Sequence, residues 1–150
     1  MKKIISVIIL LTYLLLLCGC ELFDLTETKK TLKDTTAEHL NLSLENATVL
    51  DEWDTHGGFH GDGMTFVKLK CDDGFEEGLI SDWKSLPMDG EAYEYFYEWG
   101  GVFEHPETGE KIIPEVENAY WYFKNTGPMN WEFALYDLDE DILYFYILDA

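Results

Sequence analysis

The stretch Trp131-Glu132-Phe133-Ala134-Leu135-Tyr136, followed by Ile142-Leu143-Tyr144-Phe145-Tyr146-Ile147, decides the fold of this chain. Both runs consist mainly of aromatic and aliphatic residues, which favour the pleated surface of a sheet. Between them stands Asp137-Leu138-Asp139-Glu140-Asp141, a short acidic segment suited to joining two antiparallel strands. The sequence therefore predicts a hairpin over these residues.

Three further segments have the character of strands. Residues 119–123, Ala-Tyr-Trp-Tyr-Phe, are aromatic at consecutive positions, which indicates a central strand covered on both faces. Residues 48–54 and 64–71 flank a glycine-rich loop, and the second segment alternates between apolar and polar residues. These two segments predict another hairpin, which brings the expected sheet to about five antiparallel strands.

Two short helices are expected between the hairpins. The first ends before Pro87, and the second spans residues 90–99 with Asp89 as its N-cap. Their expected buried faces are Phe75, Leu79, Ile80 and Trp83 in the first helix and Ala92, Phe96 and Trp99 in the second. The predicted fold class is α+β: a single antiparallel sheet of about five strands with two short helices packed on one face.

The N-terminal residues have the pattern of an export signal. Two lysines precede an apolar run of 14 residues over positions 4–17, which is shorter than the roughly 20 residues of a membrane-spanning helix. The run ends in Leu17-Cys18-Gly19-Cys20, which resembles the lipobox of bacterial lipoproteins. The resemblance implies that the Cys20 sulfur receives a diacylglycerol and that the chain is cut between Gly19 and Cys20. Cys18 is a poorer acceptor because Leu17, which is not small, precedes it.

This resemblance sets the expected domain organisation and location. Residues 1–19 are the expected lipoprotein signal peptide, residues 20–43 an acidic, threonine-rich, lipid-anchored tether, and residues 44–150 the α+β domain. Acyl chains on Cys20 give stable attachment to a membrane. The protein is expected to be exported and anchored to the outer face of the cell membrane, or to the periplasmic side of an outer membrane.

The charge of the chain is strongly negative. The formal net charge is −20, the sequence contains no arginine, and loss of Lys2 and Lys3 with the signal peptide makes it −22. Nucleic-acid binding needs a cationic surface, so this class is excluded. Anionic lipid headgroups also repel such a surface, and attachment to a membrane therefore depends on the lipid. A basic protein or a divalent cation is the electrostatically favoured partner, although high charge can also serve solubility alone.

Asp54, His56, His60 and Asp62 form the densest group of imidazoles and carboxylates in the sequence. Both ligand types bind zinc and other transition metals, so the glycine-rich loop is a candidate site for a divalent metal, the one cofactor considered. Acid–base catalysis by the same residues stays open. The structural alternative is that the glycines allow a tight turn, the aspartates accept hydrogen bonds from loop amides, and the histidines brace the turn.

The same loop carries a second resemblance. Residues 54–63, Asp-Thr-His-Gly-Gly-Phe-His-Gly-Asp-Gly, resemble a segment shared by small uncharacterised bacterial lipoproteins and exported proteins. Residues 83–87 and 143–146 also fit, and the resemblance covers roughly residues 44–150. It implies an exported protein of this class and supplies no activity.

Other residues that carry chemistry have simpler interpretations. Once Cys20 is acylated and Cys18 removed, Cys71 has no partner for a disulfide within the chain, and its neighbours Asp72 and Asp73 disfavour a thiolate. Asp137-x-Asp139-x-Asp141 begins like a calcium loop but lacks the glycine and glutamate of an EF-hand, so a solvated turn is the preferred interpretation. The motifs of serine hydrolases, zinc proteases and P-loop proteins are absent.

The sequence therefore predicts a non-enzymatic, lipid-anchored envelope protein that binds another protein. Two alternatives stay open. One is a metal-dependent site or enzyme at the glycine-rich loop. The other is a glycan-binding domain, because the chain contains 9 Phe, 9 Tyr and 5 Trp, and exposed rings stack on sugars.

Overall fold

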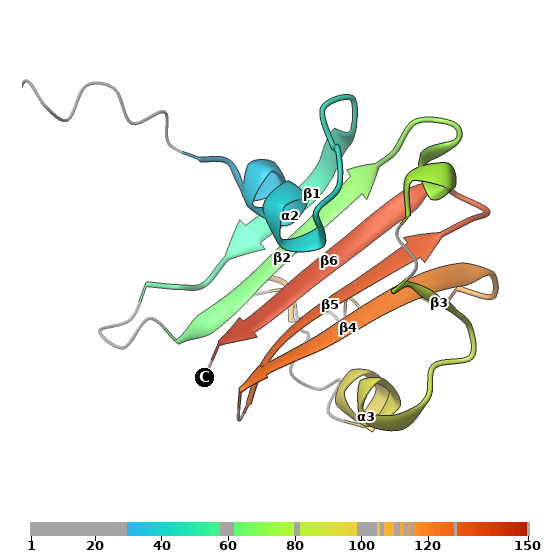
Figure 1. Cartoon of the computed structure of the whole chain (residues 1–150). Coiled ribbons are helices and arrows are strands. Elements are labelled where there is room, and N and C mark those ends of the chain that lie inside the picture. The colour runs from blue at the N-terminus through green and yellow to red at the C-terminus, as the bar shows by residue number, and fades with distance from the viewer. Residues whose placement is uncertain are drawn as a thin grey trace, which may run out of the picture. The chain divides into compact units, whose positions relative to one another are not determined.

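An open antiparallel sheet is the centre of the fold. The computed structural model describes residues 30–57, 62–79, 82–98, 105, 107–109, 112, 114, 116–127 and 129–149, and the predicted signal peptide and lipobox lie outside these ranges. The described residues form six strands in the order β1-β2-β6-β5-β4-β3 (Figure 1). The strands are β1 (Thr48–Asp54), β2 (Gly63–Lys70), β3 (Lys84–Ser85), β4 (Ala119–Gly127), β5 (Asn130–Asp137) and β6 (Ile142–Asp149). The predicted α+β class with an antiparallel sheet is confirmed.

The C-terminal hairpin occupies the middle of the sheet, as its composition indicates. Strands β5 and β6 pair from Asp137↔Ile142 to Trp131↔Leu148, and β2 and β4 flank them. Successive side chains of a strand point to opposite faces, and both runs have large apolar residues at consecutive positions. The hairpin therefore brings apolar side chains to both faces, and each face needs a cover.

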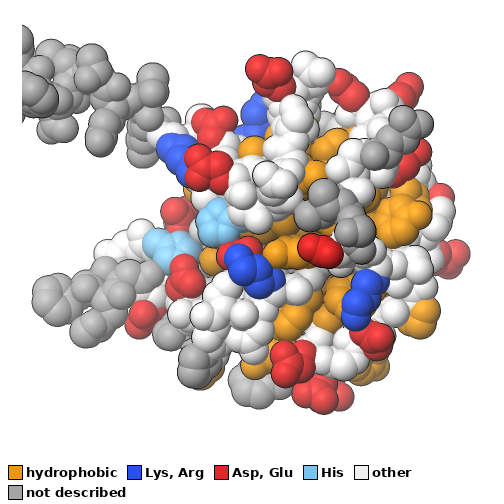
Figure 2. Space-filling view, in the orientation of Figure 1, with side chains coloured by type: hydrophobic (Ala, Val, Ile, Leu, Met, Phe, Trp, Pro, Cys, Tyr) orange, Lys and Arg blue, Asp and Glu red, His pale blue; other side chains and the backbone are white. Residues whose placement is uncertain are grey.

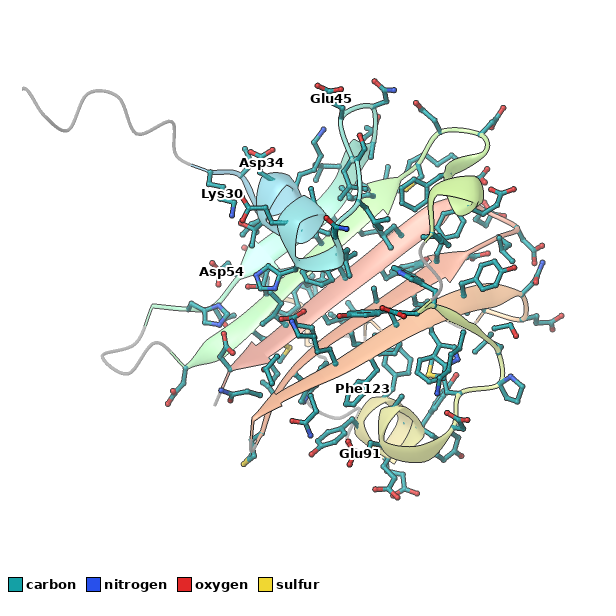
Figure 3. All side chains as sticks on the ribbon, viewed as in Figure 1. Lys30, Asp34, Glu45, Asp54, Glu91 and Phe123 are labelled. Atoms are coloured by element: carbon teal, nitrogen blue, oxygen red, sulfur yellow. The ribbon has the colours of Figure 1, made fainter. Side chains whose placement is uncertain are left out.

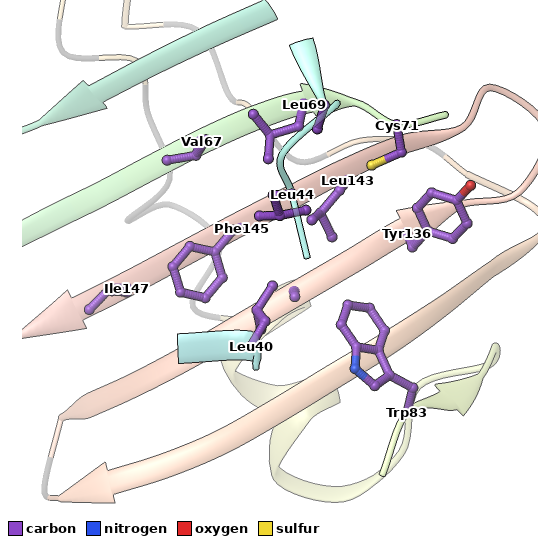
Figure 4. Close-up of a cluster of buried hydrophobic side chains, with 12 residues drawn as sticks. Leu40, Leu44, Val67, Leu69, Cys71, Trp83, Tyr136, Leu143, Phe145 and Ile147 are labelled. Atoms are coloured by element: carbon purple, nitrogen blue, oxygen red, sulfur yellow. The ribbon is translucent and has the colours of Figure 1, made fainter. Parts of the chain in front are cut away.

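Two separate hydrophobic clusters meet this requirement. We call one side of the sheet the α2 face; its core contains Phe145 and Tyr136 and is shown in part in Figure 4. We call the other side the α3 face; there Phe96 stacks on Phe133 with 4.3 Å between ring centroids. Phe133 and Phe145 are 1 % and 0 % exposed. Both faces of the sheet are thus core.

The expectation that the two helices predicted over residues 75–83 and 90–99 pack on one face is wrong, because Phe75 packs against the α2-face cluster and Phe96 belongs to the α3-face cluster. Helix α2 (Leu32–Leu40) contributes to the core of the α2 face. Helix α3 (Gly90–Tyr93) and the π-helical turn η2 (Glu94–Glu98) contribute Ala92 and Phe96 to the α3 face. The physical reason is the two-sided apolar hairpin, which cannot leave either face exposed to water. Trp99, the third residue of the expected stripe, lies outside the described residues.

Helix α2 also shows that the predicted tether is too long. It lies within residues 20–43, yet Leu40 is buried in the core together with Leu44. Lys33 fixes the segment that follows, because its Nζ donates to the carbonyl oxygens of Glu45 at 3.2 Å and Ala47 at 3.0 Å. The tether prediction is therefore wrong from Leu32 onward, and residues 20–29 lie outside the described residues.

The first expected helix is reduced to a single 3₁₀ turn, η1 (Phe75–Gly78). Gly74 enters the turn with a positive φ of 84°, and Leu79 leaves it in an extended conformation. Phe75 still packs inward, with its ring 5.0 Å from that of Tyr136. The apolar spacing of this segment therefore reflects contacts with the sheet rather than a continuous helix.

Candidate functional site

A row of polar side chains crosses one end of the α2 face. Strand pairing places Asp54 opposite Thr65, Thr65 opposite Ile147, Ile147 opposite Glu132, and Glu132 opposite Lys124. Residues directly opposite each other in a sheet share a face, so these side chains form one line across five strands. We call Asp54, Thr65, Glu132 and Lys124, with the two histidines that contact them, the polar row. Figure 2 shows this face, with its histidine, lysine and carboxylate side chains among apolar ones.

Glu132 is the buried carboxylate of the polar row. Its side chain is 7 % exposed, and its Oε1 lies 3.1 Å from Nδ1 of His39 in α2 and 3.2 Å from Nζ of Lys124 in β4. A buried charge is costly unless it is paired, and these two groups supply the compensation. The three residues and Glu38 line an open hollow of about 290 Å³. The arrangement joins α2 to the sheet through a polar contact as well as through apolar contacts.

His56 lies between two carboxylates at the other end of the row. Its Nδ1 is 2.5 Å from Oδ1 of Asp54, and its Nε2 is 3.4 Å from Oδ2 of Asp149. The backbone N–H of His56 also donates to Asp54 Oδ1 at 2.9 Å, which closes a local turn. Gly63 is required beside it, because a Cβ there would lie only 2.7 Å from the backbone nitrogen of His56. The turn, the imidazole and the start of β2 thus fit together as one unit.

The polar row lacks the geometry of a hydrolytic triad. The Thr65 hydroxyl lies 3.3 Å from Nδ1 of His56, the same nitrogen that contacts Asp54. A triad needs the nucleophile on one imidazole nitrogen and the carboxylate on the other. Here Asp54 and Thr65 compete for the same nitrogen, and the second nitrogen lies 3.4 Å from Asp149 without forming a hydrogen bond within the described residues. These contacts fit a structural role for His56 better than activation of a nucleophile.

The predicted metal ligands are brought together only in part. Asp54 and His56 are in contact, Asp62 is exposed directly before β2, and His60 lies outside the described residues. Within the part of the chain that the structure describes, no three His, Cys, Asp or Glu side chains converge as metal ligands. The metal site at Asp54, His56, His60 and Asp62 stays a prediction.

Cys71 is a buried thiol at the end of β2. It is 4 % exposed, and burial raises the pKa of its thiol to about 12, with Asp141 and Asp72 adding to the shift. A thiol with such a pKa is almost entirely protonated near neutral pH and is a poor nucleophile. Its packing against the α2-face core matches the interpretation of Cys71 as a small apolar residue.

The protein is expected to lose stability steeply in alkaline solution. Unfolding returns the pKa of Cys71 from about 12 to about 9.0, so the unfolded chain releases a proton that the native chain keeps. Below pH 9 this contribution to stability is complete, and above it the free energy of unfolding falls by about 1.4 kcal/mol per pH unit per group. Burial also raises the pKa of Tyr136 and Tyr146, which steepens the loss above pH 10.

Urea unfolding at several pH values between 8 and 11.5 measures this slope. Cys71→Ala is the matched control, because it removes one of the groups and flattens the slope between pH 9 and the pKa of the native thiol, about 12. A free energy of unfolding that stays constant from pH 8 to pH 11.5 contradicts the assignment of these groups as buried and neutral.

Two carboxylates of the acidic turn between β5 and β6, those of Asp137 and Asp141, form contacts within the domain. Asp137 Oδ1 accepts hydrogen bonds from the backbone N–H groups of Asp139 at 2.9 Å and Glu140 at 3.2 Å. Asp141 accepts from the Tyr136 hydroxyl at 3.0 Å and lies 3.4 Å from Nζ of Lys70. These contacts support the interpretation of residues 137–141 as a turn.

Exposed aromatic residues gather on α3 and η2. Tyr93 and Tyr97 are each 47 % exposed, and with Pro87 and Met88 they line a hollow of about 430 Å³. Their ring centroids are 5.1 Å apart, but the planes are tilted by 39°. Two coplanar rings would make a flat platform for a sugar, and this pair does not form one. Glycan binding stays a prediction.

The described surface is acidic because carboxylates far outnumber lysines. Lys33, Lys70, Lys84 and Lys124 each contact an oxygen of the protein, and Lys68 lies over the ring of Tyr144. Exposed carboxylates are spread over helices, turns and strand ends (Figures 2 and 3). They are Asp34, Glu38, Glu45, Glu52, Asp54, Asp62, Asp72, Asp73, Glu76, Asp82, Asp89, Glu91, Glu94, Glu98, Glu107, Glu117, Asp139 and Glu140.

Comparisons with known proteins identify no relative. Family models, curated proteins and solved structures were compared with the chain, and none of them matches it. Within the described ranges, every helix is too short or too polar to cross a membrane.

Proposed function

We propose that this chain is an exported protein, attached to the outer face of a membrane by a lipid on Cys20, that binds a basic protein through its acidic domain. The observation that carries the proposal is the excess of exposed carboxylates over exposed lysines on the described surface. Exposed carboxylates lie on most elements and far outnumber the exposed lysines, which include Lys70, Lys84 and Lys124. Such a surface attracts cationic partners and repels anionic ones.

The lipid on Cys20 and the negative charge of the domain have complementary roles in this proposal. Anionic headgroups repel a domain with this charge, so the domain needs a covalent anchor to stay near a membrane. The lipobox-like Leu17-Cys18-Gly19-Cys20 supplies one. Repulsion then keeps the domain away from the bilayer and leaves its surface accessible to a second protein.

The binding chemistry is non-covalent in this proposal. The polar row contains imidazoles and carboxylates, but Asp54 holds Nδ1 of His56, and Glu132 is held between the imidazole of His39 and the ammonium group of Lys124. The buried thiol of Cys71 has a raised pKa. These three observations favour a binding protein over an enzyme.

A capture experiment tests the proposal. The full chain, held in detergent micelles on beads, is mixed with envelope proteins of its own organism at about 0.01 M salt, where charges act over about 30 Å. We expect a basic protein to be retained and then released at about 0.15 M to 1 M salt, because screening shortens that range to about 8 Å and about 3 Å.

The control is an unrelated acidic protein of similar net charge on the same beads. A basic protein retained by this chain and not by the control supports the proposal. Retention of the same proteins by both sets of beads, or retention of none at low salt, contradicts it.

A further inference from the structure

Strand β1 leaves one edge of the sheet open. It pairs with β2 on one side, and within the described residues no strand pairs with its other side. The N–H of Thr55 donates to the carbonyl oxygen of Met64 at 2.9 Å. This hydrogen bond shows that the backbone groups of Thr55 point toward β2. Because inward and outward groups alternate along an antiparallel strand, the N–H and C=O groups of Glu52 and Asp54 point to the open edge. Such an edge is a template for another strand.

The side chains of β1 indicate what kind of strand fits. Val49 and Leu50 are 39 % and 50 % exposed, and Leu50 is the extra residue of a bulge between Val49 and Asp51. Glu52 and Asp54 are exposed on the same strand. The edge therefore combines apolar contact area with negative charge.

The opposite edge of the sheet has a different character. There β3 covers part of β4, with Lys84 opposite Trp121. Lys84 and Lys124 belong to these two strands. Of the two edges, β1 is the one that carries carboxylates and exposed aliphatic side chains.

We propose that the open edge of β1 binds an extended, lysine- or arginine-containing segment of a partner protein as an additional strand. This inference rests on the proposed function and identifies β1 as the strand that contacts the basic partner. Main-chain hydrogen bonds provide the affinity, and the alternating side chains of the segment provide the selectivity. Its cationic side chains lie beside Glu52 and Asp54, and its apolar side chains cover Val49 and Leu50.

A second copy of this chain is a poorer occupant. Pairing two β1 strands edge to edge brings the carboxylates of Asp51, Glu52 and Asp54 near those of the second copy, and like charges across a strand pair are destabilising. Each copy also has a formal net charge of −20. Charge complementarity therefore selects a basic segment.

A synthetic peptide serves as the probe. It alternates lysine and valine over about eight residues, within the usual length of a strand, and a second version carries N-methyl groups on alternate backbone amides. Both versions have the same charge, but methylation removes the amide hydrogens that pair with an edge. We expect the full chain to bind the first peptide at low salt at least about tenfold more tightly than the second.

Two matched variants locate the binding. Leu50 and Met129 are 50 % and 53 % exposed, so Leu50→Lys and Met129→Lys add the same charge at sites that tolerate it. Leu50→Lys is expected to weaken binding of the first peptide by about tenfold, because an edge lysine repels the cationic strand. When the variants are compared at about 0.15 M salt, where charges act over about 8 Å, Met129→Lys is expected to weaken it by less than about twofold, because Met129 lies between β4 and β5, several strands away from β1.

Equal weakening by the two variants, or equal affinity for the two peptides, overturns the β1 site. Either outcome leaves the proposed function standing, because binding then follows overall charge. Failure of the envelope capture experiment contradicts the proposed function itself, so the two failures are distinguishable.

Discussion

Phe133→Ala and Phe145→Ala are each expected to lower the free energy of unfolding by about 3 to 5 kcal/mol. Both side chains are fully buried, Phe133 on the α3 face and Phe145 on the α2 face. Removal of either ring loses its transfer from water and leaves a cavity that the sheet cannot close. A domain of this size has about 5 to 15 kcal/mol in total, so each change removes a large share.

Urea unfolding followed by tryptophan fluorescence measures both changes. Met129→Ala is the control, because its side chain is 53 % exposed and its loss is expected to change stability by less than about 0.5 kcal/mol. Phe133→Ala and Phe145→Ala together test whether the sheet is covered on both faces. A cost below about 1 kcal/mol for one of the two phenylalanine variants indicates that its face is not a core.

Cys20→Ala is expected to move nearly all of the protein from the detergent phase to the aqueous phase in a phase-separation assay. The proposed anchor is the lipid on the Cys20 sulfur, and an acidic domain has no affinity of its own for anionic headgroups. The matched control is Cys18→Ala, which changes a cysteine two positions away and is expected to stay in the detergent phase.

Labelling with a radioactive fatty acid separates anchoring from expression. Wild type and Cys18→Ala are expected to take up label, and Cys20→Ala is not. If Cys20→Ala stays in the detergent phase and takes up label, the anchor lies elsewhere in the chain and the lipobox interpretation is wrong.

The hairpins could be predicted because their signals are local. Residues 131–147 contain two apolar runs around an acidic turn, and the structure pairs them as expected. The distribution of helices between the faces could not be predicted in the same way, since it depends on which elements pack together. Residues 36–40 are compatible with one helical turn, but the full length of α2 and its packing on the sheet were not predicted, because only Thr36 and Leu40 of this helix are fully buried.

The polar row shows the same division between local and distant contacts. Asp54 and His56 are two positions apart, and their contact follows from the sequence pattern. The contact of Glu132 with His39 joins segments far apart in the chain, and no spacing rule indicates it. One signal was present: Glu132 is a charged residue between Trp131 and Phe133 in an otherwise apolar strand. Such a residue needs a partner, and its position in the sequence does not say which one.

The salt dependence of affinity tests the central claim most directly. The full chain in detergent micelles is titrated with the purified envelope protein from the capture experiment, from about 0.01 M to about 0.15 M salt. If the acidic surface carries the binding, the dissociation constant increases steeply and continuously over this range. A dissociation constant that does not change with salt contradicts the claim that the acidic domain recognises its partner by charge.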